Sequence, residues 1–183
     1  MKICRCQWVN DDPIYQKYHD EEWGKPVYDD KKLYEMFLLE TFQAGLSWIT
    51  ILHKREAFKK AFDHFDVQKI ALYDDLKVDE LLHNSSIIRN RRKIISAIKN
   101  AGIFIQIQKE FGSFSNYLWS FTNNQVIALK DQEPVTRNAL SDQISVDLKK
   151  RGMSFVGSIT IYSFLEAVGI MNNHQKQCYL HKK

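Results

Sequence analysis

The chain has few of the residues that cross-link or break a fold: its 183 residues include three cysteines, three prolines and seven glycines. So few cysteines argue against a disulfide framework and leave metal binding open. The apolar runs are far too short to cross a bilayer, and the first residues lack the apolar core of an export signal. We therefore expect a cytoplasmic protein with no membrane partner.

The composition suits a folded domain with a substantial core. Apolar residues make up 44% of the chain and aromatic residues 13%, so some aromatic side chains are available for a site built on stacking. The net charge of +4 is mildly basic and permits nucleic-acid binding without requiring it. The length fits one domain or two small lobes around a shared cleft. No self-association signal is present, so we expect a monomer.

Helical periodicity dominates the sequence. Asp12-Pro13 is typical of a helix start, with an aspartate N-cap and a proline in the first turn. Asp29 or Asp30 begins a second predicted helix, and a turn at Gln43-Ala44-Gly45 separates it from a third. Further helices are expected over roughly 67–73, 78–83, 89–111, 137–150 and 159–168. Since only 126–129 resembles a strand, within an expected loop over 123–134, we predict an all-α fold.

Two cysteine–histidine pairs lie near opposite ends of the chain. Cys6 and His19 form the first pair, and His174 and Cys178, one helical turn apart, form the second. Together they make a Cys₂His₂ set, which suits tetrahedral zinc. On spacing alone, a partly buried histidine and an inert thiol are the favoured interpretation. Two further residues compete for the same role: Cys4 and His181.

A carboxylate interrupts an apolar helix face. Glu40 shares this face with Leu33 and Phe37, so it either lines a pocket or reaches solvent at the helix end. Several aromatic residues could surround it as a cage that stacks a flat ligand, or form an aromatic core of their own. These are Trp8, Tyr15, Tyr18, Trp23 and Trp48.

A basic run follows the turn-like Asn84-Ser85-Ser86 and the apolar pair Ile87-Ile88. A hairpin between two helices can present backbone N–H groups and cations to a DNA phosphate. A solvated basic helix face is the competing interpretation. The cations in question are Arg89, Arg91, Arg92 and Lys93.

Taken in order, these motifs resemble the bacterial 3-methyladenine DNA glycosylase I family over nearly the whole chain. The most specific block is Leu39-Glu40 followed by Gln43-Ala44-Gly45-Leu46-Ser47-Trp48-Ile49-Thr50. The other matching blocks are Cys6-Gln7-Trp8, Asp12-Pro13 with Tyr15, Tyr18-His19-Asp20 with Glu22-Trp23-Gly24, Ile87-Ile88-Arg89-Asn90-Arg91, Phe155-Val156-Gly157 with Tyr162-Ser163-Phe164, and the His174 and Cys178 pair.

The resemblance implies an all-α fold of the helix-hairpin-helix DNA glycosylase superfamily. It also implies a monofunctional N-glycosyl hydrolase that flips out and excises 3-methyladenine from alkylated double-stranded DNA, which starts base-excision repair. The product is free 3-methyladenine, and the substrate is the DNA of the bacterial nucleoid. One structural zinc ion is implied as the only cofactor, and it would join the two ends of the chain.

The resemblance further assigns roles to individual residues. Glu40 would be the catalytic residue, primarily in base recognition and secondarily in water activation. The base would be bound by Trp48, Tyr15, Tyr18, Trp8 and Trp23. DNA would be contacted by Gln43, Gly45 and Leu46 near the abasic gap, with Leu46 as the plug, and by Arg89, Arg91, Arg92 and Lys93. Zinc would be held by Cys6, His19, His174 and Cys178.

We predict a single unit over 1–183, with a helical core over about 30–165 and a hairpin near 84–93. The segments 1–28 and 166–183 are expected to be joined by zinc. Hairpins of this class favour glycine at the turn, whereas Ser85-Ser86 occupies it here.

Two other functions compete with glycosylase activity. A hydrolase with a catalytic zinc is disfavoured because four protein ligands leave no position for water. A non-catalytic, zinc-stabilised DNA-binding module would keep the metal and the hairpin but has no need of Glu40.

Overall fold

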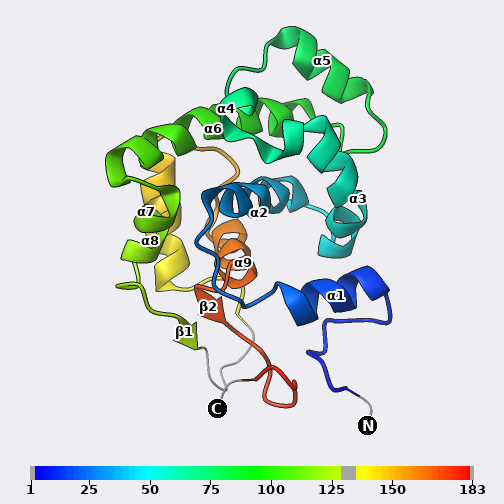
Figure 1. Cartoon of the computed structure of the whole chain (residues 1–183), viewed down its shortest axis with the longest axis vertical. Helices are drawn as coiled ribbons and strands as arrows, with labels where there is room; N and C mark the ends of the chain where they lie inside the picture. The colour runs from blue at the N-terminus through cyan, green and yellow to red at the C-terminus, as the bar shows by residue number, and fades with distance from the viewer. Residues whose placement is uncertain (1–2, 129–134, 182–183) are drawn as a thin grey trace.

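The computed structural model describes residues 3–128 and 135–181 and has a mainly helical architecture (Figure 1). The first half contains α1 (Pro13–Glu21), α2 (Asp30–Gln43), α3 (Trp48–Ala61), the 3₁₀ turn η1 (Asp63–Phe65), α4 (Val67–Ile70) and α5 (Asp75–His83). The second half contains α6 (Arg91–Phe111), α7 (Phe114–Ser120), α8 (Ala139–Lys150) and α9 (Ser158–Ala167). No helix of the described ranges is long and apolar enough to span a membrane.

One small sheet departs from the all-α prediction. The two-residue strands β1 (Ile127–Ala128) and β2 (Met171–Asn172) pair in parallel, with Ile127 opposite Met171. The strand-like run predicted over 126–129 therefore contains β1, although its last residue lies outside the described residues, as do the last six residues of the loop predicted over 123–134. Two residues are too few for β2 to produce a recognisable sequence pattern.

Side-chain caps determine where several helices begin and end. The Asp12 carboxylate accepts hydrogen bonds from two backbone N–H groups of α1. The Asp29 carboxylate accepts one hydrogen bond, from the backbone N–H of Lys32 in α2. The Asn90 side chain caps α6, so this helix begins at Arg91, two residues later than the predicted start. Gly112 ends α6 with a φ of +82°, a conformation that glycine adopts without steric cost.

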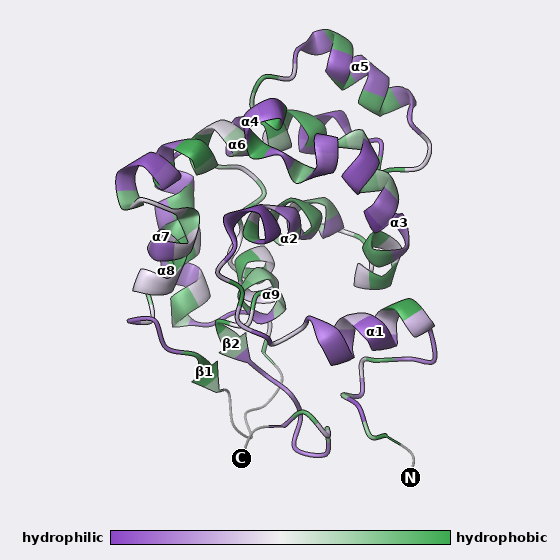
Figure 2. Cartoon of the chain, viewed as in Figure 1, coloured by the Kyte–Doolittle hydropathy of each residue, from purple (hydrophilic) through white to green (hydrophobic). Residues whose placement is uncertain are grey.

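The central helix is α2, which packs against α3, α6, α7 and α9. Almost every residue from Leu33 to Phe42 is buried, and Phe37 contacts Phe164 of α9 with a ring-centroid distance of 5.5 Å. Figure 2 shows that α9 is also rich in apolar residues. Because α2 is enclosed in this way, a polar side chain in its second half lies inside the protein and needs a partner there.

The first and last described segments of the chain contact each other. The backbone N–H of Tyr179 donates to the carbonyl of Cys4 at 2.9 Å, and the N–H of Gln7 donates to the Gln175 side chain at 2.6 Å. Nearby, Gly169 has a φ of +71° and lies directly against the Lys25–Pro26 backbone, where a Cβ atom has no room. The segment that follows α9 is thereby directed towards the N-terminal residues.

Candidate functional site

A cavity of about 170 Å³ lies among α1, α2, α9 and the first residue of α3. Its walls combine aromatic rings with two carboxylates. The lining residues are Trp8, Tyr15, Tyr18, Trp23, Glu40, Gln43, Trp48, Ser163 and Glu166. The structure therefore brings the five predicted aromatic residues together with Glu40 and Gln43 around one cavity.

Glu40 is buried, with only 3% of its surface exposed, which excludes the solvent-exposed glutamate of the competing interpretation. Burial raises the pKa of its carboxyl well above the usual value, and the nearby charge of Glu166 raises it further. Within the described part of the chain, Glu40 Oε2 and Trp48 Nε1 are both buried without a hydrogen-bond partner. A buried acceptor and a buried donor in one cavity are therefore available to a polar, flat ligand.

The aromatic residues contact one another around the cavity. Trp8 lies between Tyr15 and Trp23, with ring-centroid distances of 5.0 Å to each. Tyr18 and Trp48 face each other with centroids 5.4 Å apart. These tilted and edge-to-face pairs fix the ring positions before any ligand enters. The sequence left two interpretations of these residues, a cage for a flat ligand or an aromatic core. In the structure one cluster of rings forms a small core and also lines the cavity.

Two lining residues, Ser163 and Glu166, are additions to the predicted site, and both lie on α9. Burial raises the pKa of Glu166 to about 7, although a hydrogen bond from Asn173 Nδ2 at 2.8 Å opposes the shift. A signal for Glu166 is present in the sequence. It is the only charged residue of the run 159–168, just as Glu40 interrupts the apolar pattern of α2.

A half-buried ion-pair network holds α1, α2 and α3 together. The Arg55 guanidinium of α3 donates to both carboxylate oxygens of Glu22 at 2.8 Å and to Glu35 of α2 at 2.7 Å. Burial alone would raise the pKa of Glu22, but the hydrogen bonds from Arg55 and Lys32 lower it to about 2. The network joins the end of α1 to the helices that carry Glu40 and Trp48.

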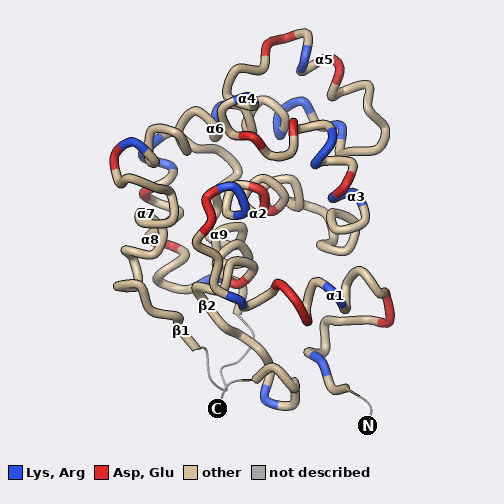
Figure 3. Tube along the Cα trace, viewed as in Figure 1, with Lys and Arg blue, Asp and Glu red and all other residues tan. Residues whose placement is uncertain are grey.

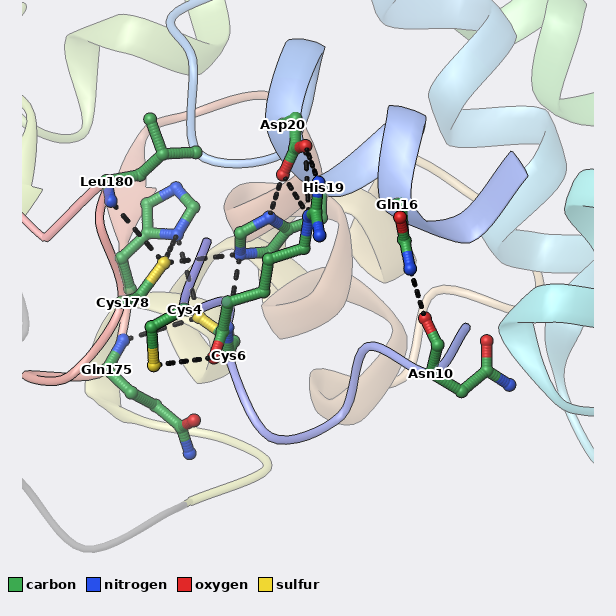
Figure 4. A network of polar contacts seen from close by, with 11 residues as sticks. Cys4, Cys6, Asn10, Gln16, His19, Asp20, Gln175, Cys178 and Leu180 are labelled. Carbon is green, nitrogen blue, oxygen red and sulfur yellow. Dashed lines mark hydrogen bonds and ion pairs between the residues drawn. The ribbon is translucent and has the colours of Figure 1, made fainter. Parts of the chain in front are cut away.

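The four predicted metal ligands converge in a single buried cluster. Their ligand atoms all lie within 4.8 Å of one another (Figure 4). Cys178 Sγ is 3.5 Å from His19 Nε2 and 3.6 Å from His174 Nδ1, and Cys6 Sγ is 3.6 Å from the same Nδ1. Tetrahedral zinc with its usual bond lengths separates sulfur and nitrogen ligands by about 3.6 Å. The arrangement of donors therefore fits zinc.

Outer contacts orient these ligands as they do in metal sites. His19 turns Nε2 to the cluster and places Nδ1 2.8 Å from Asp20 Oδ1, and Asp20 pairs with Arg5 at 2.7 Å. Backbone N–H groups of Gln175 and Leu180 point at the sulfurs of Cys6 and Cys178, respectively. The two competing candidates lie outside the cluster: Cys4, which is exposed, and His181, whose ring bonds to the carbonyl of His174.

The metal cluster and the cavity share a wall. The Trp23 ring lies edge-on to the His174 ring with centroids 4.7 Å apart, and Trp8 lies 5.3 Å from the His19 ring. Trp8 and Trp23 also line the cavity. A change in the cluster is thus transmitted by direct contact to two aromatic walls of the pocket.

The basic run lies at the start of α6: Arg89 comes just before the helix, and the other three cations lie in its first turn. Arg89, Arg91 and Arg92 are exposed, and Figure 3 shows that Lys and Arg are interspersed with Asp and Glu along the rest of the trace. Residues 84–90 all have negative φ, so the turn does not require glycine and Ser85-Ser86 fits it. Lys54 of α3 donates to the carbonyl of Ser86 at 3.0 Å and supports the turn.

The structure corrects the prediction for Lys93. Its side chain is 6% exposed, and its Nζ donates to the carbonyl oxygens of Phe42 at 2.8 Å and Ala44 at 2.6 Å. The cation therefore caps the C-terminal end of α2 and is not available to phosphate. Beyond this cap, Gly45 has a φ of +81°, and Leu46 is 40% exposed between the cavity residues Gln43 and Trp48 of the sequence.

Comparisons with known proteins agree on one family. Residues 8–181 match the family model described as methyladenine glycosylase. The chain is 45% identical to DNA-3-methyladenine glycosylase 1 of Escherichia coli, over 95% of each chain. It is 43% identical to DNA-3-methyladenine glycosylase of Haemophilus influenzae, over 95% of this chain and 96% of the relative. A crystal structure of a variant 3-methyladenine DNA glycosylase I in complex with 3-methyladenine matches with a TM-score of 0.93, 37% identity and 98% coverage of both chains.

Proposed function

The chain belongs to the methyladenine glycosylase family, and from this membership we propose how its pocket acts on DNA. The protein is a DNA-3-methyladenine glycosylase, which hydrolyses the N-glycosidic bond of the alkylated nucleotide and starts base-excision repair. The observation that supports the pocket's role is the pair of buried, unpartnered atoms, Glu40 Oε2 and Trp48 Nε1. A DNA-binding module without catalysis has no use for such a pair.

The substrate itself lowers the demand on the catalyst. Methylation at N3 makes the base of the nucleotide cationic, so the glycosidic bond is already weakened and the base leaves as a neutral molecule. The enzyme has to extrude the nucleotide, recognise the base and admit water. Extrusion costs a few kcal/mol, and least for a damaged base that stacks and pairs less well.

The pocket is suited to a positively charged, flat ring. Stacking on Trp48 brings the cation over an electron-rich face, which is worth about 0.5–2 kcal/mol. Glu40 accepts hydrogen bonds from the exocyclic amine, and its negative charge favours the cation. The cation in turn favours the ionised form of Glu40 against burial. Base recognition and electrostatic stabilisation are therefore the main roles we assign to Glu40, and water activation is secondary.

The DNA backbone is bound by the helix-hairpin-helix formed by α5, the turn over 84–90 and α6. The exposed Arg89, Arg91 and Arg92 lie at the start of α6, where cations and unpaired backbone N–H groups can face one phosphate. The loop with Gln43, Gly45 and Leu46 lies at the abasic gap, and the exposed Leu46 side chain fills it.

The Cys₂His₂ cluster binds one structural zinc ion. Cys6, His19, His174 and Cys178 supply four protein ligands, which complete a tetrahedral site and leave no position for a reacting water. When bound, the metal supplies cross-linking and no chemistry on DNA. The residues of the cluster hold Trp8 and Trp23 in place, so their effect on excision is indirect.

Release of free 3-methyladenine from methylated duplex DNA tests this function. We expect the purified, metal-loaded protein to release the base with multiple turnovers, and to release none of the normal bases from unmethylated DNA of the same sequence. A folded protein that binds abasic DNA but releases no 3-methyladenine would be a binding module, contrary to the proposal.

A further inference from the structure

The pocket contains a second carboxylate for which the proposed reaction has so far given no role. Glu166 lies on α9 and lines the same cavity as Glu40. Its Oε1 accepts the hydrogen bond from Asn173 Nδ2 at 2.8 Å, while Oε2 has no hydrogen-bond partner within the described ranges. A carboxylate fixed through one oxygen leaves the other free for a ligand or solvent in the cavity.

Carboxyl and phenol groups surround Glu166. The titratable groups that face it are Glu40 from α2, Tyr18 from α1 and Tyr162 from α9 itself. Asn173, which follows β2, is uncharged and also reaches Tyr162. In the described part of the structure, no lysine or arginine forms an ion pair with Glu166. Two carboxylates in one partly dry cavity disfavour each other's ionised form.

The reaction changes the charge of this cavity by one unit. A cationic nucleotide reacts with water: the bond from the sugar C1′ to the base N9 breaks, and its electron pair stays on N9. The base becomes neutral, the water oxygen bonds to C1′, and one proton is released. The pocket must therefore stabilise a positive ring before cleavage and a neutral ring afterwards.

We propose that Glu166 is the second carboxylate of base recognition. Ionised, it faces the positive purine together with Glu40, and it binds a proton set free by hydrolysis, so that the pocket is less negative when the neutral base leaves. This inference rests on the proposed excision of 3-methyladenine. It makes Glu166 a determinant of specificity for positively charged purines over neutral ones.

The burial of Glu166 suits this exchange. Burial raises the pKa of its carboxyl to about 7, and the Asn173 hydrogen bond keeps it from rising further. Glu166 therefore gains and loses its proton near neutral pH without a large free-energy cost. The deeper Glu40 has its pKa raised well above the usual value and is ionised mainly when a cation is present.

The test compares Glu166→Gln with the unaltered protein over pH 5.5–8.5, with kcat/KM measured from the release of 3-methyladenine from methylated duplex DNA. At pH 8 the variant should be about tenfold slower, the effect of one partly solvated charge pair. At pH 5.5 the two proteins should have nearly equal kcat/KM, because Glu166 is then largely protonated and neither protein has a negative charge at this position. Glu21→Gln, which removes an exposed carboxylate on α1, serves as the control and should match the unaltered protein at every pH.

Two measurements separate this role from a structural one. Because burial penalises the ionised carboxylate, the stability lost to Glu166 grows from pH 4.5, its unfolded pKa, to about pH 7, its folded one. Glu166→Gln should therefore raise the melting temperature most at pH 8, less at pH 5.5 and little below pH 4.5. Asn173→Ala keeps the carboxylate and removes the bond that favours its charged form. This variant should move the midpoint of the pH–activity profile upward.

The assignment would be overturned if the ratio of kcat/KM between Glu166→Gln and the unaltered protein did not vary with pH. It would also be overturned if the pH–activity profile of Asn173→Ala had an unchanged midpoint. Both results require an active unaltered protein. If that protein releases no 3-methyladenine at any pH, the proposed function fails instead, so the two failures are distinguishable.

Discussion

At the scale of single residues, the pocket depends on Glu40, a carboxylate whose position is favourable only when something positive or hydrogen-bonding enters. In the described structure its Oε2 is buried without a hydrogen-bond partner, as is the N–H of Trp48, which lines the same cavity. Such groups reduce the stability of the empty protein, and a ligand that pairs with both recovers that loss.

We expect Glu40→Gln to lower kcat/KM for 3-methyladenine release by about 10²–10³, the range for losing one electrostatic contact to a reacting group. Binding to abasic DNA should change little, because that contact lies outside the pocket. Base release and fluorescence anisotropy measure the two properties. Glu56→Gln, an exposed position on α3, is the matched control. Equal losses in excision and abasic binding would contradict a role in the pocket.

The sequence indicated the positions of some charged residues more clearly than those of others. Glu40 was found because it interrupts an apolar helix face, and Glu166 carries the same signal on α9, but no matched motif contained it. Lys93 was wrongly predicted to face DNA because a basic run does not reveal which side chain turns inward. Its spacing from Ala97 and Ala101 places it on the buried face of α6, and this periodicity was the better guide.

At the scale of helices and loops, Lys93 connects α6 to the C-terminal end of α2. The residue belongs to the first turn of α6, yet its ammonium binds the last carbonyls of α2. The element that we propose for phosphate binding and the loop that we propose for the abasic gap are therefore linked by one side chain.

Replacing Lys93 with Met should destabilise the protein by about 1.5–3 kcal/mol, because two carbonyls lose a charged hydrogen-bond donor. Urea unfolding measures this change. Lys99→Met removes an exposed lysine from the same helix and should have little effect. Equal stabilities of the two variants would show that the Lys93 contacts contribute nothing.

The ion pairs among α1, α2 and α3 make stability depend on pH in acid. The folded-state pKa of Glu22 is lowered to about 2, so its contribution is fully present above the unfolded value near 4.5 and is lost as pH falls towards 2. Glu22→Gln should therefore melt at a lower temperature than the unaltered protein at pH 7, and the difference should shrink below pH 4.5. Thermal melts monitored by circular dichroism would detect this; a difference constant from pH 7 to pH 3 would contradict it.

Helix boundaries were largely predictable because local chemistry sets them: Asp12-Pro13 starts α1 and Gly112 ends α6. The pairing of β1 with β2 was not predictable, since it depends on two short segments that meet only after the helices pack. The turn at Ser85-Ser86 is also set by local backbone conformation. Its backbone has no positive φ, so the absence of glycine carried less meaning than the family pattern suggested.

At the scale of the whole molecule, the cysteine–histidine cluster joins residues separated by most of the chain. Cys6 and His174 are 168 positions apart, yet their ligand atoms lie 3.6 Å from each other. The residue types alone left Cys4 and His181 as competing ligands, and the family resemblance selected Cys6 and His174. The fold gives the physical reason for that choice, because the side chains of Cys6 and His174 are the ones that turn into the cluster.

We expect Cys178→Ser to reduce bound zinc from one ion per chain to near zero. The melting temperature should fall by roughly 10 °C, which corresponds to about 3–4 kcal/mol at this chain length. Metal analysis and thermal unfolding test both, and Cys4→Ser, which alters the exposed cysteine, should retain metal and stability. Loss of excision without either change would contradict a structural metal.

The cavity is lined by residues far apart in the sequence: Trp8, Tyr15 and Trp48 come first, and Ser163 and Glu166 of α9 follow long after them. During synthesis on a ribosome the first wall emerges long before the second, and neither encloses a base alone. A chain interrupted before α9 would carry the hairpin arginines but not a closed pocket. Excision is therefore a property that the protein acquires only once α9 has been translated and packed against α2.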